Sequence, residues 1–555
     1  MLFCVFILLC SNAQASYIYH VLRKLMHDRF ISFLLDIHTF KRYTIKVRII
    51  YFSFLKRNLS MIYKNPVLKG FYPDPSVCFA NGKYYLVTST FQYFPGVALF
   101  ESDNLVNWKQ IGYVLTRPEQ VMLDKIPASG GVFAPTIRYN NGRFYMVTTN
   151  DTTHRNFYVY TDDIYGEWSD PIEVDQGGID PSLYFEDGRT FFISNGQDDY
   201  GEGGVVQCEI DIATGKKLSH SKSIWKGSGG RYLESPHVYK INGRYYLMAA
   251  EGGTEYGHMI TYAISDDIWG EYVTGDNNPI LTNRNKAPYI IQGIGHGDLI
   301  QDKNGDWHIL SLGFRQMGIW MPFHSLGREV FLSPAHFDEN GRLFAGLDGT
   351  TDAQYEIKGD FVQNELPVFT FGNTDPSVDW CYLRKYHPEN YKLSADKYEL
   401  CGTDLTLDDM DSPTFIAMRQ RDFDMELCVN VNLCGNGEGG VTMYMCENEH
   451  YDIALKKTAD GTFAILKLNI GGIKHEQNRA AVNADNATLI VRADHYNYNF
   501  FVKCGDTETH LGSGQVKYLT SEVSGGFTGT MTGLYAVGGT AQFTGFSCAY
   551  TESEE

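Results

Sequence analysis

One short unit recurs five times in the chain and constrains the fold more than any other feature. In each copy, an Asn-Gly or Asp-Gly pair stands between runs that are rich in apolar residues. The copies are Asn81-Gly82-Lys83-Tyr84-Tyr85, Asn141-Gly142-Arg143-Phe144-Tyr145, Asp187-Gly188-Arg189-Thr190-Phe191, Asn242-Gly243-Arg244-Tyr245-Tyr246 and Asn304-Gly305-Asp306-Trp307-His308. Such a pair is a strong β-hairpin signal, because both turn residues must adopt a positive φ. The spacing leaves room for one four-stranded sheet per copy.

A second pattern precedes each hairpin by eight residues and opens the strand that leads into it. The segments at this place are Asp74-Pro75-Ser76, Ala134-Pro135-Thr136, Asp180-Pro181-Ser182, Ser235-Pro236-His237 and, in the fifth copy, Gly295-His296-Gly297-Asp298. Five similar sheets built from such units are typical of a β-propeller. We therefore predict an all-β chain with a five-bladed β-propeller over residues 61–350.

The chain beyond residue 350 lacks this repeat. We predict a linker over 351–372 and, over 373–555, short alternating strands joined by tight turns. One example is Tyr451–Lys457 followed by Thr462–Leu468, with Ala459-Asp460-Gly461 between them. This pattern indicates an antiparallel β-sandwich.

Residues 1–60 differ from the rest of the chain in charge. They hold nine Lys and Arg against two Asp and Glu, which gives a formal charge of +7. The whole chain carries −19, so residues 61–555 carry 38 − 64 = −26. A body this acidic repels nucleic acid and anionic membrane and favours a neutral or cationic substrate. We interpret 1–60 as an extension outside the fold. The alternative is a signal peptide, with an apolar run over Leu2–Cys10 and Ala13-Gln14-Ala15 as the cleavage site.

The cysteines bear on the compartment. Nine of the 11 cysteines lie after residue 60, at irregular spacings and without a Cys-x-x-Cys pair. This usage indicates free thiols in a reducing compartment, and we predict a cytoplasmic protein. Export to the periplasm is the alternative if the N-terminal segment is a signal peptide. No apolar run after the N-terminal segment is long enough to span a bilayer, so we expect no membrane partner.

The propeller repeat brings ionisable residues together. The innermost strands of a propeller run along its axis, so equivalent positions at their starts meet at one mouth. Asp74, Asp180, Glu234 and His296 occupy such positions. An Asp before Pro on its own usually caps a turn, but three carboxylates at one mouth repel and raise one another's pKa. Glycoside hydrolysis requires one carboxylate as base or nucleophile and another kept protonated as acid.

Longer stretches of sequence carry a family resemblance through residues 62–345. They are Asn65-Pro66-Val67-Leu68-Lys69-Gly70-Phe71-Tyr72-Pro73-Asp74-Pro75-Ser76, Ser89-Thr90-Phe91, Phe94-Pro95-Gly96-Val97, Gly178-Ile179-Asp180-Pro181-Ser182, Glu234-Ser235-Pro236-His237, Glu251-Gly252-Gly253-Thr254, Gly295-His296-Gly297-Asp298-Leu299 and Leu326-Gly327-Arg328-Glu329. In these motifs the chain resembles the β-xylosidases and α-L-arabinofuranosidases of glycoside hydrolase family 43. Its tail resembles that family's concanavalin-like, jelly-roll C-terminal domain.

The resemblance implies a role for each carboxylate. Asp74 resembles the general base that activates water, and Glu234 resembles the general acid that protonates the leaving oxygen. Asp180 resembles the third carboxylate, which orients the acid and tunes its pKa. Family members of this type invert the configuration of the sugar they release.

The resemblance also implies pocket residues. These are Phe91, Phe133, Thr254, His296 and Arg328, with Phe527 as a candidate from the C-terminal domain. Some relatives carry Trp where Phe133 stands, a difference that bears on substrate preference. No cofactor is required, although some relatives hold a cation, usually calcium, on the axis near the equivalent of His296.

We predict an exo-acting β-xylosidase that acts on xylo- or arabinoxylo-oligosaccharides and also has α-L-arabinofuranosidase activity. The alternative is mainly an α-L-arabinofuranosidase that removes arabinose side chains. A remote alternative is a non-catalytic sugar-binding propeller, which would be expected to lack a catalytic carboxylate. Retaining fructosidases with five blades are disfavoured, because their Asn-Asp-Pro-Asn-Gly and Arg-Asp-Pro motifs are absent. The chain could form a homo-oligomer, and we expect its sandwich to brace the propeller rather than to bind sugar.

A chain that starts at Met61 should fold and hydrolyse substrate as the full chain does, because the repeat lies entirely after that residue. Thermal melting and kcat/KM of the two chains provide the measurement. An insoluble or inactive shorter chain would show that residues 1–60 belong to the fold.

Overall fold

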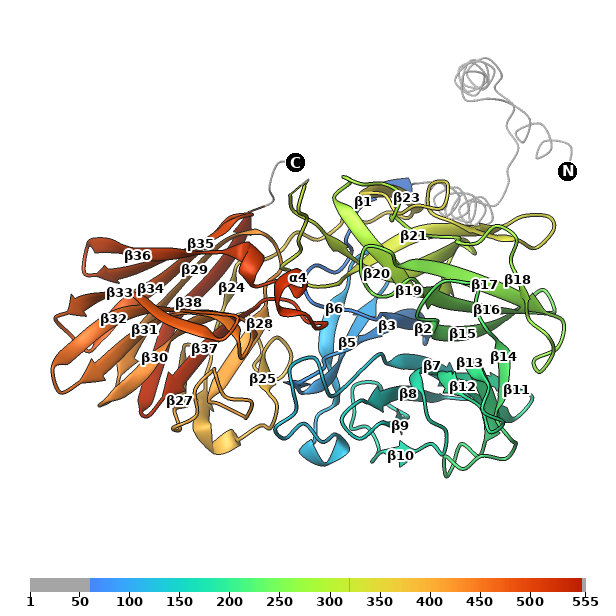
Figure 1. Cartoon of the computed structure of the whole chain (residues 1–555), viewed down its shortest axis with the longest axis horizontal. Coiled ribbons are helices and arrows are strands. Elements are labelled where there is room, and N and C mark those ends of the chain that lie inside the picture. Colours follow the sequence, from blue (N-terminus) through green and yellow to red (C-terminus); the bar gives the residue numbers. More distant parts are fainter. Residues whose placement is uncertain (1–59, 319, 552–555) are drawn as a thin grey trace, which may run out of the picture. The chain divides into compact units, whose positions relative to one another are not determined.

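The computed structural model describes residues 60–318 and 320–551 (Figure 1). All of the predicted extension except Ser60 therefore lies outside the described residues. The predicted all-β architecture is confirmed, with five four-stranded sheets followed by two eight-stranded sheets. The helical segments are short: η2 (Pro118–Gln120), η3 (Pro388–Asn390), η4 (Val516–Tyr518) and α4 (Ser521–Ser524). In the described part of the chain, no helix is long and apolar enough to cross a membrane.

The five-bladed propeller is confirmed, and the strands of each blade follow one another in the chain, except that β4 interrupts the first blade. The blades run from blue through green to yellow in Figure 1. Their strands are β2 (Ser76–Ala80), β3 (Lys83–Thr88), β5 (Gly96–Ser102) and β6 (Lys109–Leu115); β7 (Thr136–Asn140), β8 (Arg143–Asn150), β9 (Arg155–Thr161) and β10 (Ile172–Glu173); β11 (Ile179–Glu186), β12 (Arg189–Gln197), β13 (Gly203–Ile210) and β14 (Lys222–Trp225); β15 (Glu234–Ile241), β16 (Arg244–Glu251), β17 (Met259–Ser265) and β18 (Val273–Thr274); β19 (Ile291–Gln301), β20 (Trp307–Arg315), β21 (Glu329–Phe337) and β22 (Leu343–Ala345).

Four of the five predicted hairpin turns have the expected geometry. In the first copy, Asn81 and Gly82 have φ of 51° and 83°, and the next three copies repeat this pair of positive values. The fifth copy differs, because Asn304 is not in the left-handed region although Gly305 is, with φ of 91°. There the turn is longer, since Asp302 Oδ1 accepts hydrogen bonds from the backbone N–H groups of Asn304 and Asp306, each at 2.8 Å. An Asp side chain that caps its own loop replaces the two-residue turn.

The inner strands have an unusual backbone at or next to the aligned positions, and this feature positions the site. Asp74, Asp180, Ser235 and His296 have φ of 57°, 52°, 55° and 38°. The register of β11, β15 and β19 with their partner strands shifts at these points, as it does at a β-bulge. Bulges re-aim side chains next to active sites, so the repeat fixes a direction for each residue as well as its place.

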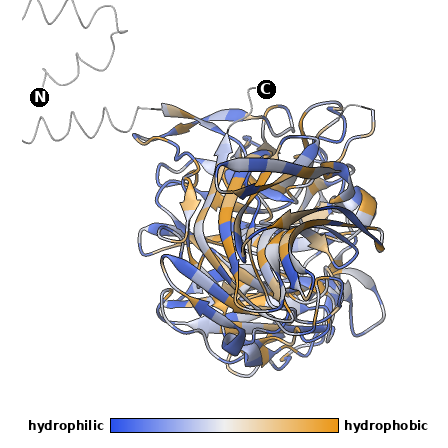
Figure 2. Cartoon of the chain, turned by 90° about the vertical axis from the view of Figure 1, so that its left-hand side faces the viewer, coloured by the Kyte–Doolittle hydropathy of each residue, from blue (hydrophilic) through white to orange (hydrophobic). Residues whose placement is uncertain are grey.

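The C-terminal domain is the predicted β-sandwich (orange to red in Figure 1). One sheet has the order β26-β27-β38-β29-β34-β35-β36, with β24 also paired to β38; the other has the order β33-β32-β31-β30-β37-β28-β25-β4. The strands are β24 (Phe369–Thr370), β25 (Cys381–Leu383), β26 (Tyr391–Leu393), β27 (Lys397–Cys401), β28 (Phe415–Arg419), β29 (Asp424–Leu433), β30 (Gly437–Cys446), β31 (Glu449–Thr458), β32 (Gly461–Ile470), β33 (Ile473–Val482), β34 (Asn486–Ala493), β35 (Asn497–Cys504), β36 (Thr507–Gln515), β37 (Met531–Val537) and β38 (Thr540–Thr551). Hydrophobic and hydrophilic bands are visible along its strands in Figure 2, and β29 buries every second residue.

A propeller segment adds a strand to the sandwich. The two-residue strand β4 (Tyr93–Phe94) leaves the first blade and pairs with β25. The backbone N–H of Arg384 also donates to the carbonyl of Gln92 at 2.8 Å. The sandwich therefore holds the stretch of chain that follows Phe91. A separate two-stranded sheet pairs β1 (Ser60–Lys64) with β23 (Gln354–Lys358).

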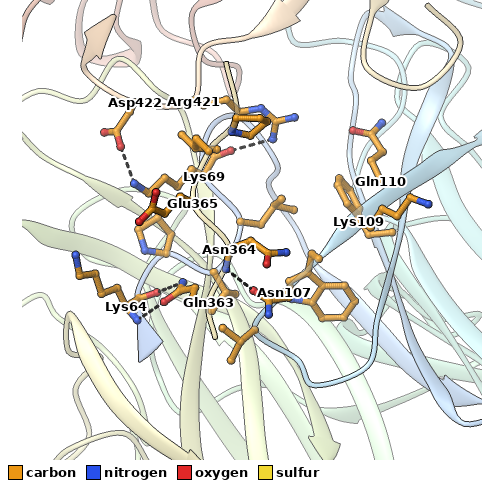
Figure 3. A pocket seen from close by; sticks show the side chains of 18 of the residues that line it. Lys64, Lys69, Asn107, Lys109, Gln110, Gln363, Asn364, Glu365, Arg421 and Asp422 are labelled. Atoms are coloured by element: carbon orange, nitrogen blue, oxygen red, sulfur yellow. Dashed lines mark hydrogen bonds and ion pairs between the residues drawn. The ribbon is translucent and has the colours of Figure 1, made fainter. Parts of the chain in front are cut away.

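A groove of about 1560 Å³ lies beside Met61–Lys69, between the first blade and the start of the sandwich (Figure 3). Lys69 Nζ lies 2.6 Å from Asp422 Oδ2, and the side chain of Gln363 donates to the carbonyl of Lys64 at 2.8 Å. None of the predicted site residues lines this groove. It is therefore distinct from the carboxylate cluster.

Candidate active site

The four residues predicted to meet at the propeller mouth lie together. His296 Nδ1 is 3.7 Å from Asp74 Oδ1 and also 3.7 Å from Asp180 Oδ2. Asp180 Oδ2 accepts a hydrogen bond from the backbone N–H of Ser235 at 3.1 Å. This bond fixes the backbone next to Glu234, whose carboxyl interacts electrostatically with those of Asp74 and Asp180.

Asp74 is buried with two donors on its carboxylate. Its exposed fraction is 4%. Arg328 Nη1 donates to Oδ1 at 2.9 Å, and the Ser89 hydroxyl donates to Oδ2. Burial on its own would raise the pKa of Asp74, but Arg328, His296 and Ser89 outweigh it and lower the pKa below its usual value. Asp74 is therefore ionised at neutral pH, as a base must be.

Glu234 and Asp180 behave in the opposite way. Burial, followed by the negative charge of Asp74, raises the pKa of Glu234 to about 7, although Arg328 opposes the shift. Burial and the charges of Glu234 and Asp74 also raise the pKa of Asp180 well above its usual value. The site thus holds one carboxylate that stays ionised and a neighbouring pair that retains a proton near neutrality. Such divergent carboxyl groups suit acid and base roles.

The histidines at the mouth are neutral near pH 7. Burial lowers the pKa of His296, against the opposing effect of Asp74. Burial and His296 lower the pKa of His258 to about 3, and its Nδ1 donates to the carbonyl of Gly293 at 3.2 Å. Gly295 leaves room for this ring, because a Cβ atom there would lie 2.3 Å from it. The two histidines therefore act as hydrogen-bonding groups rather than as cations.

Arg328 connects the base to the walls of the site. Its Nη1 also donates to Thr254 Oγ1 at 2.9 Å, and its Nη2 donates to the carbonyl of Phe527 at 3.1 Å. The guanidinium carbon lies 5.6 Å from the ring centroid of Phe91 and 5.7 Å from that of Phe527, within range of a cation–π contact. One buried side chain therefore joins a carboxylate, a hydroxyl and two aromatic rings.

Three phenylalanines form an aromatic wall. The ring centroid of Phe91 lies 5.5 Å from that of Phe133 and 5.9 Å from that of Phe527. Phe133 and Phe527 are 6.2 Å apart. Phe527 is 40% exposed, so part of this residue is accessible to solvent. Since Phe527 belongs to the sandwich, the structure brings together all the predicted site residues from both domains.

Several functional contacts were not predicted. Glu251 is fully buried, and its carboxylate accepts the backbone N–H groups of Ser228 and Gly230 at 2.7 and 2.5 Å and the hydroxyl of Thr261 at 2.8 Å. It thereby anchors the loop that leads into Glu234. Glu251, like Ser89, stands in a motif quoted above, but a motif does not say which atoms its residues contact.

The loop that carries Phe527 is fastened to the propeller at several points. Ser129 Oγ accepts the backbone N–H of Phe527 at 2.8 Å. On α4, Glu522 Oε1 accepts hydrogen bonds from Tyr256 at 2.9 Å and from His324 Nδ1 at 2.7 Å. These contacts join segments 198 to 398 residues apart in the chain, so no local pattern could have predicted them.

The calcium ion that the family resemblance allows near His296 finds no matching ligand set. Calcium takes six to eight oxygen ligands. No group of three or more His, Cys, Asp or Glu among residues 60–318 and 320–551 could hold a metal ion. One oxygen of Asp74 is already taken by the Arg328 cation. The residues do not fit such an ion, and no step of the reaction is assigned to one.

An ionised carboxylate beside a carboxyl of raised pKa, at the mouth of a five-bladed propeller, defines a glycoside hydrolase of the β-propeller class. The family models match both domains. Residues 63–343 match "Glycosyl hydrolases family 43", and residues 369–549 match "Beta xylosidase C-terminal Concanavalin A-like domain". The chain belongs to glycosyl hydrolase family 43.

Relatives align along nearly the whole chain. A non-reducing end α-L-arabinofuranosidase of Bacteroides ovatus is 34% identical over 86% of this chain and 91% of its own length. A xylosidase/arabinosidase of Butyrivibrio fibrisolvens is 30% identical over 86% of this chain and 96% of its own length. A solved family 43 structure from the xyloglucan locus of Bacteroides ovatus superposes with a TM-score of 0.84 at 33% identity, covering 88% of this chain and all of that one.

Replacing Glu522 by Ala should loosen the loop that carries Phe527 and raise KM more than it lowers kcat, because the catalytic carboxylates lie on other segments. We expect a rise in KM of about tenfold, which equals about 1.4 kcal/mol of binding. Steady-state kinetics on a short oligosaccharide provide the measurement. Glu476→Ala, in a surface ion pair of the same domain, is the matched control. An unchanged KM for Glu522→Ala would show that the contacts of Glu522 with Tyr256 and His324 do not support the pocket.

Proposed function

We propose that the chain is an inverting, exo-acting hydrolase that releases xylose from the non-reducing end of xylo-oligosaccharides and also acts on terminal α-L-arabinofuranose. The observation that carries this proposal is the opposite direction of two pKa shifts in one cluster. The pKa of Asp74 is lowered and that of Glu234 is raised to about 7. At neutral pH one group can accept a proton while the other donates one.

In the proposed reaction, Asp74 takes a proton from a water molecule, and the oxygen of that water attacks the anomeric carbon. The bond to the leaving oxygen breaks on the opposite face of the sugar, and Glu234 gives its proton to that oxygen. One displacement therefore inverts the anomeric configuration. Asp74 ends protonated and Glu234 ionised, and exchange with solvent restores both.

Neighbouring residues serve this reaction by fixing positions. Arg328 and Ser89 orient the Asp74 carboxylate and keep it ionised. Asp180 holds the backbone beside Glu234, and Glu251 anchors the loop that precedes it. These supports matter because a positioned acid or base acts only within hydrogen-bond reach of the proton it transfers.

Exo-action is supported by the aromatic wall. Phe527, Phe91 and Phe133 lie close together beside Arg328, and the sandwich supplies the first of them. A site walled in this way accommodates the end of a short chain better than the middle of a polymer. The apolar ring faces suit the apolar face of a single sugar unit.

An enzyme that acts mainly as an α-L-arabinofuranosidase is the second candidate. The observation in its favour is the similarity to the Bacteroides ovatus enzyme, which is named for that activity. The two sugars can present hydroxyl groups in similar places, so one pocket could accept both. The ratio of kcat/KM on 4-nitrophenyl β-D-xylopyranoside and 4-nitrophenyl α-L-arabinofuranoside separates the candidates.

Hydrolysis of xylobiose followed by proton NMR tests the mechanism. The β-linked substrate should first yield α-xylose, because a single displacement inverts the anomeric carbon. The viscosity of polymeric xylan should fall only slowly. First-formed β-xylose would contradict inversion, and a rapid loss of viscosity would contradict exo-action.

Glu234→Ala and Asp74→Ala should differ in how their effects depend on the leaving group. A sugar alkoxide leaves poorly without a proton, and general acid catalysis contributes about 10²–10⁴-fold. Glu234→Ala should therefore impair hydrolysis of xylobiose much more than that of 4-nitrophenyl xyloside, whose leaving group needs little help. Asp74→Ala should impair both equally, since both need activated water.

The pH profile provides a second measurement for the same pair. Wild-type kcat/KM should fall above pH about 7 as Glu234 loses its proton, and at low pH as Asp74 gains one. The alkaline limb should vanish in Glu234→Ala. Equal losses on both substrates together with a wild-type alkaline limb would remove Glu234 from the acid role.

A further inference from the structure

A second charged cluster lies on the inner strands, next to the carboxylates of the mouth. Arg138, on β7 of the second blade, donates from Nη1 to Asp298 Oδ2 at 2.7 Å and from Nη2 to Oδ1 at 3.3 Å. The side chain of Asp298 is 1% exposed and that of Arg138 is 17% exposed. Such a bidentate pair is both strong and geometrically specific.

The Arg138 guanidinium connects the second blade with three others. Its Nη1 also donates to Ser76 Oγ, in the first blade, at 3.2 Å, and its Nη2 contacts His237 Nδ1, in the fourth blade, at 2.9 Å. Asp298, in the fifth blade, accepts hydrogen bonds from Ser76 Oγ at 2.7 Å and from the hydroxyl of Tyr239. One cation thus ties together four of the five blades.

The three side chains that Arg138 contacts in other blades stand just after residues of the site. Ser76 follows Asp74 by two positions, and Asp298 follows His296 by two. His237 follows Glu234 by three positions. A β-strand advances about 3.3 Å per residue, so the ring of contacts lies roughly one layer from the carboxylates. A shift of this layer would move the carboxylates with it.

The ring also lies where the propeller must close. Each blade is built from one continuous stretch of chain, so the first and fifth blades share no strand within the part of the chain that the structure describes. Asp298 bridges this seam through Ser76 Oγ and through the backbone N–H of Val77, the latter at 3.0 Å. Arg138 neutralises the negative charge of Asp298, the residue that forms this bridge.

The cluster combines one fixed cation with a neutral histidine. Arg is charged at any working pH. Burial, with the help of Arg138, lowers the pKa of His237 to about 3, so this ring is neutral. Its Nδ1 accepts the Arg138 hydrogen bond, which leaves the proton on Nε2 and keeps that atom from binding a metal.

We propose that Arg138 is the resident cation of the propeller axis, where it positions the catalytic carboxylates in place of a divalent metal ion. Arg138 is a positioning residue, since it acts through Ser76, His237 and Asp298 and touches no reacting atom. The inference rests on the proposed hydrolase function.

The first test uses the full-length wild-type chain and calcium itself. After dialysis against EDTA, kcat/KM on xylobiose should be unchanged, and added CaCl₂ should not raise it. Loss of activity in EDTA with recovery on addition of calcium would overturn the proposal. An enzyme inactive on xylobiose and on both nitrophenyl glycosides under all these conditions would instead contradict the proposed function.

The second test compares Arg138→Met and Arg138→Lys with the wild type. Arg138→Met should lower kcat by about 10²-fold with little change in KM, because small displacements of catalytic groups have effects of this size. Arg138→Lys keeps the charge and should recover part of the loss. Arg143→Met is the matched control, since Arg143 belongs to an exposed ion pair with Asp162 in the same blade and should leave kcat unchanged.

Folding is checked by thermal melting and circular dichroism. If Arg138→Met does not fold, Arg138→Met/Asp298→Asn removes both charges and avoids a buried unpaired carboxylate. This double variant should fold and show the same fall in kcat. A folded variant without Arg138 that keeps wild-type kcat would overturn the proposal, as would failure of both Met variants to fold while Arg138→Lys keeps wild-type kcat.

Discussion

The buried ion pair between Arg328 and Asp74 is the interaction on which the rest of the site depends. A carboxylate this deeply buried would ordinarily gain a proton, and the adjacent guanidinium prevents it. Burial, and then the charge retained on Asp74, raise the pKa of Glu234. One arrangement therefore keeps Asp74 ionised and helps Glu234 to hold its proton, and the loss of either partner of a buried pair is costly.

The same guanidinium explains why the site spans two domains. Arg328 binds Thr254 of the fourth blade and the carbonyl of Phe527 of the sandwich. Its donors are distributed over a hydroxyl, a carboxylate and a carbonyl from three distant parts of the chain. The geometry of the Asp74 carboxylate is thus coupled to the placement of the aromatic wall.

Local signals accounted for the propeller and for the convergence of its carboxylates. The Asn-Gly turns, such as Asn81-Gly82, specify positive φ over two residues, and their repetition reveals the blade period. For Asn304-Gly305 the predicted two-residue turn was wrong, because Asp302 caps a longer loop there. The predicted pocket residues came from the family resemblance, which reaches Phe527 in the other domain.

The remaining contacts could not be predicted because they join residues without a shared local pattern. Ser129 meets Phe527 across 398 residues, and Arg138 meets Asp298 across 160. The second blade is instructive here, since Ala134 stands where the first and third blades have Asp74 and Asp180. We predicted no ionisable site residue in that blade, yet Arg138 lies on its strand β7.

The pairing of β4 with β25 has a consequence for inheritance. A strand from the first blade completes a sandwich sheet, and a sandwich loop returns Phe527 to the propeller mouth. A recombination event that exchanged one domain for a distant relative's would disrupt both connections at once. Exchange of either domain would therefore have to preserve both connections for the site to stay intact, even though each domain has its own architecture.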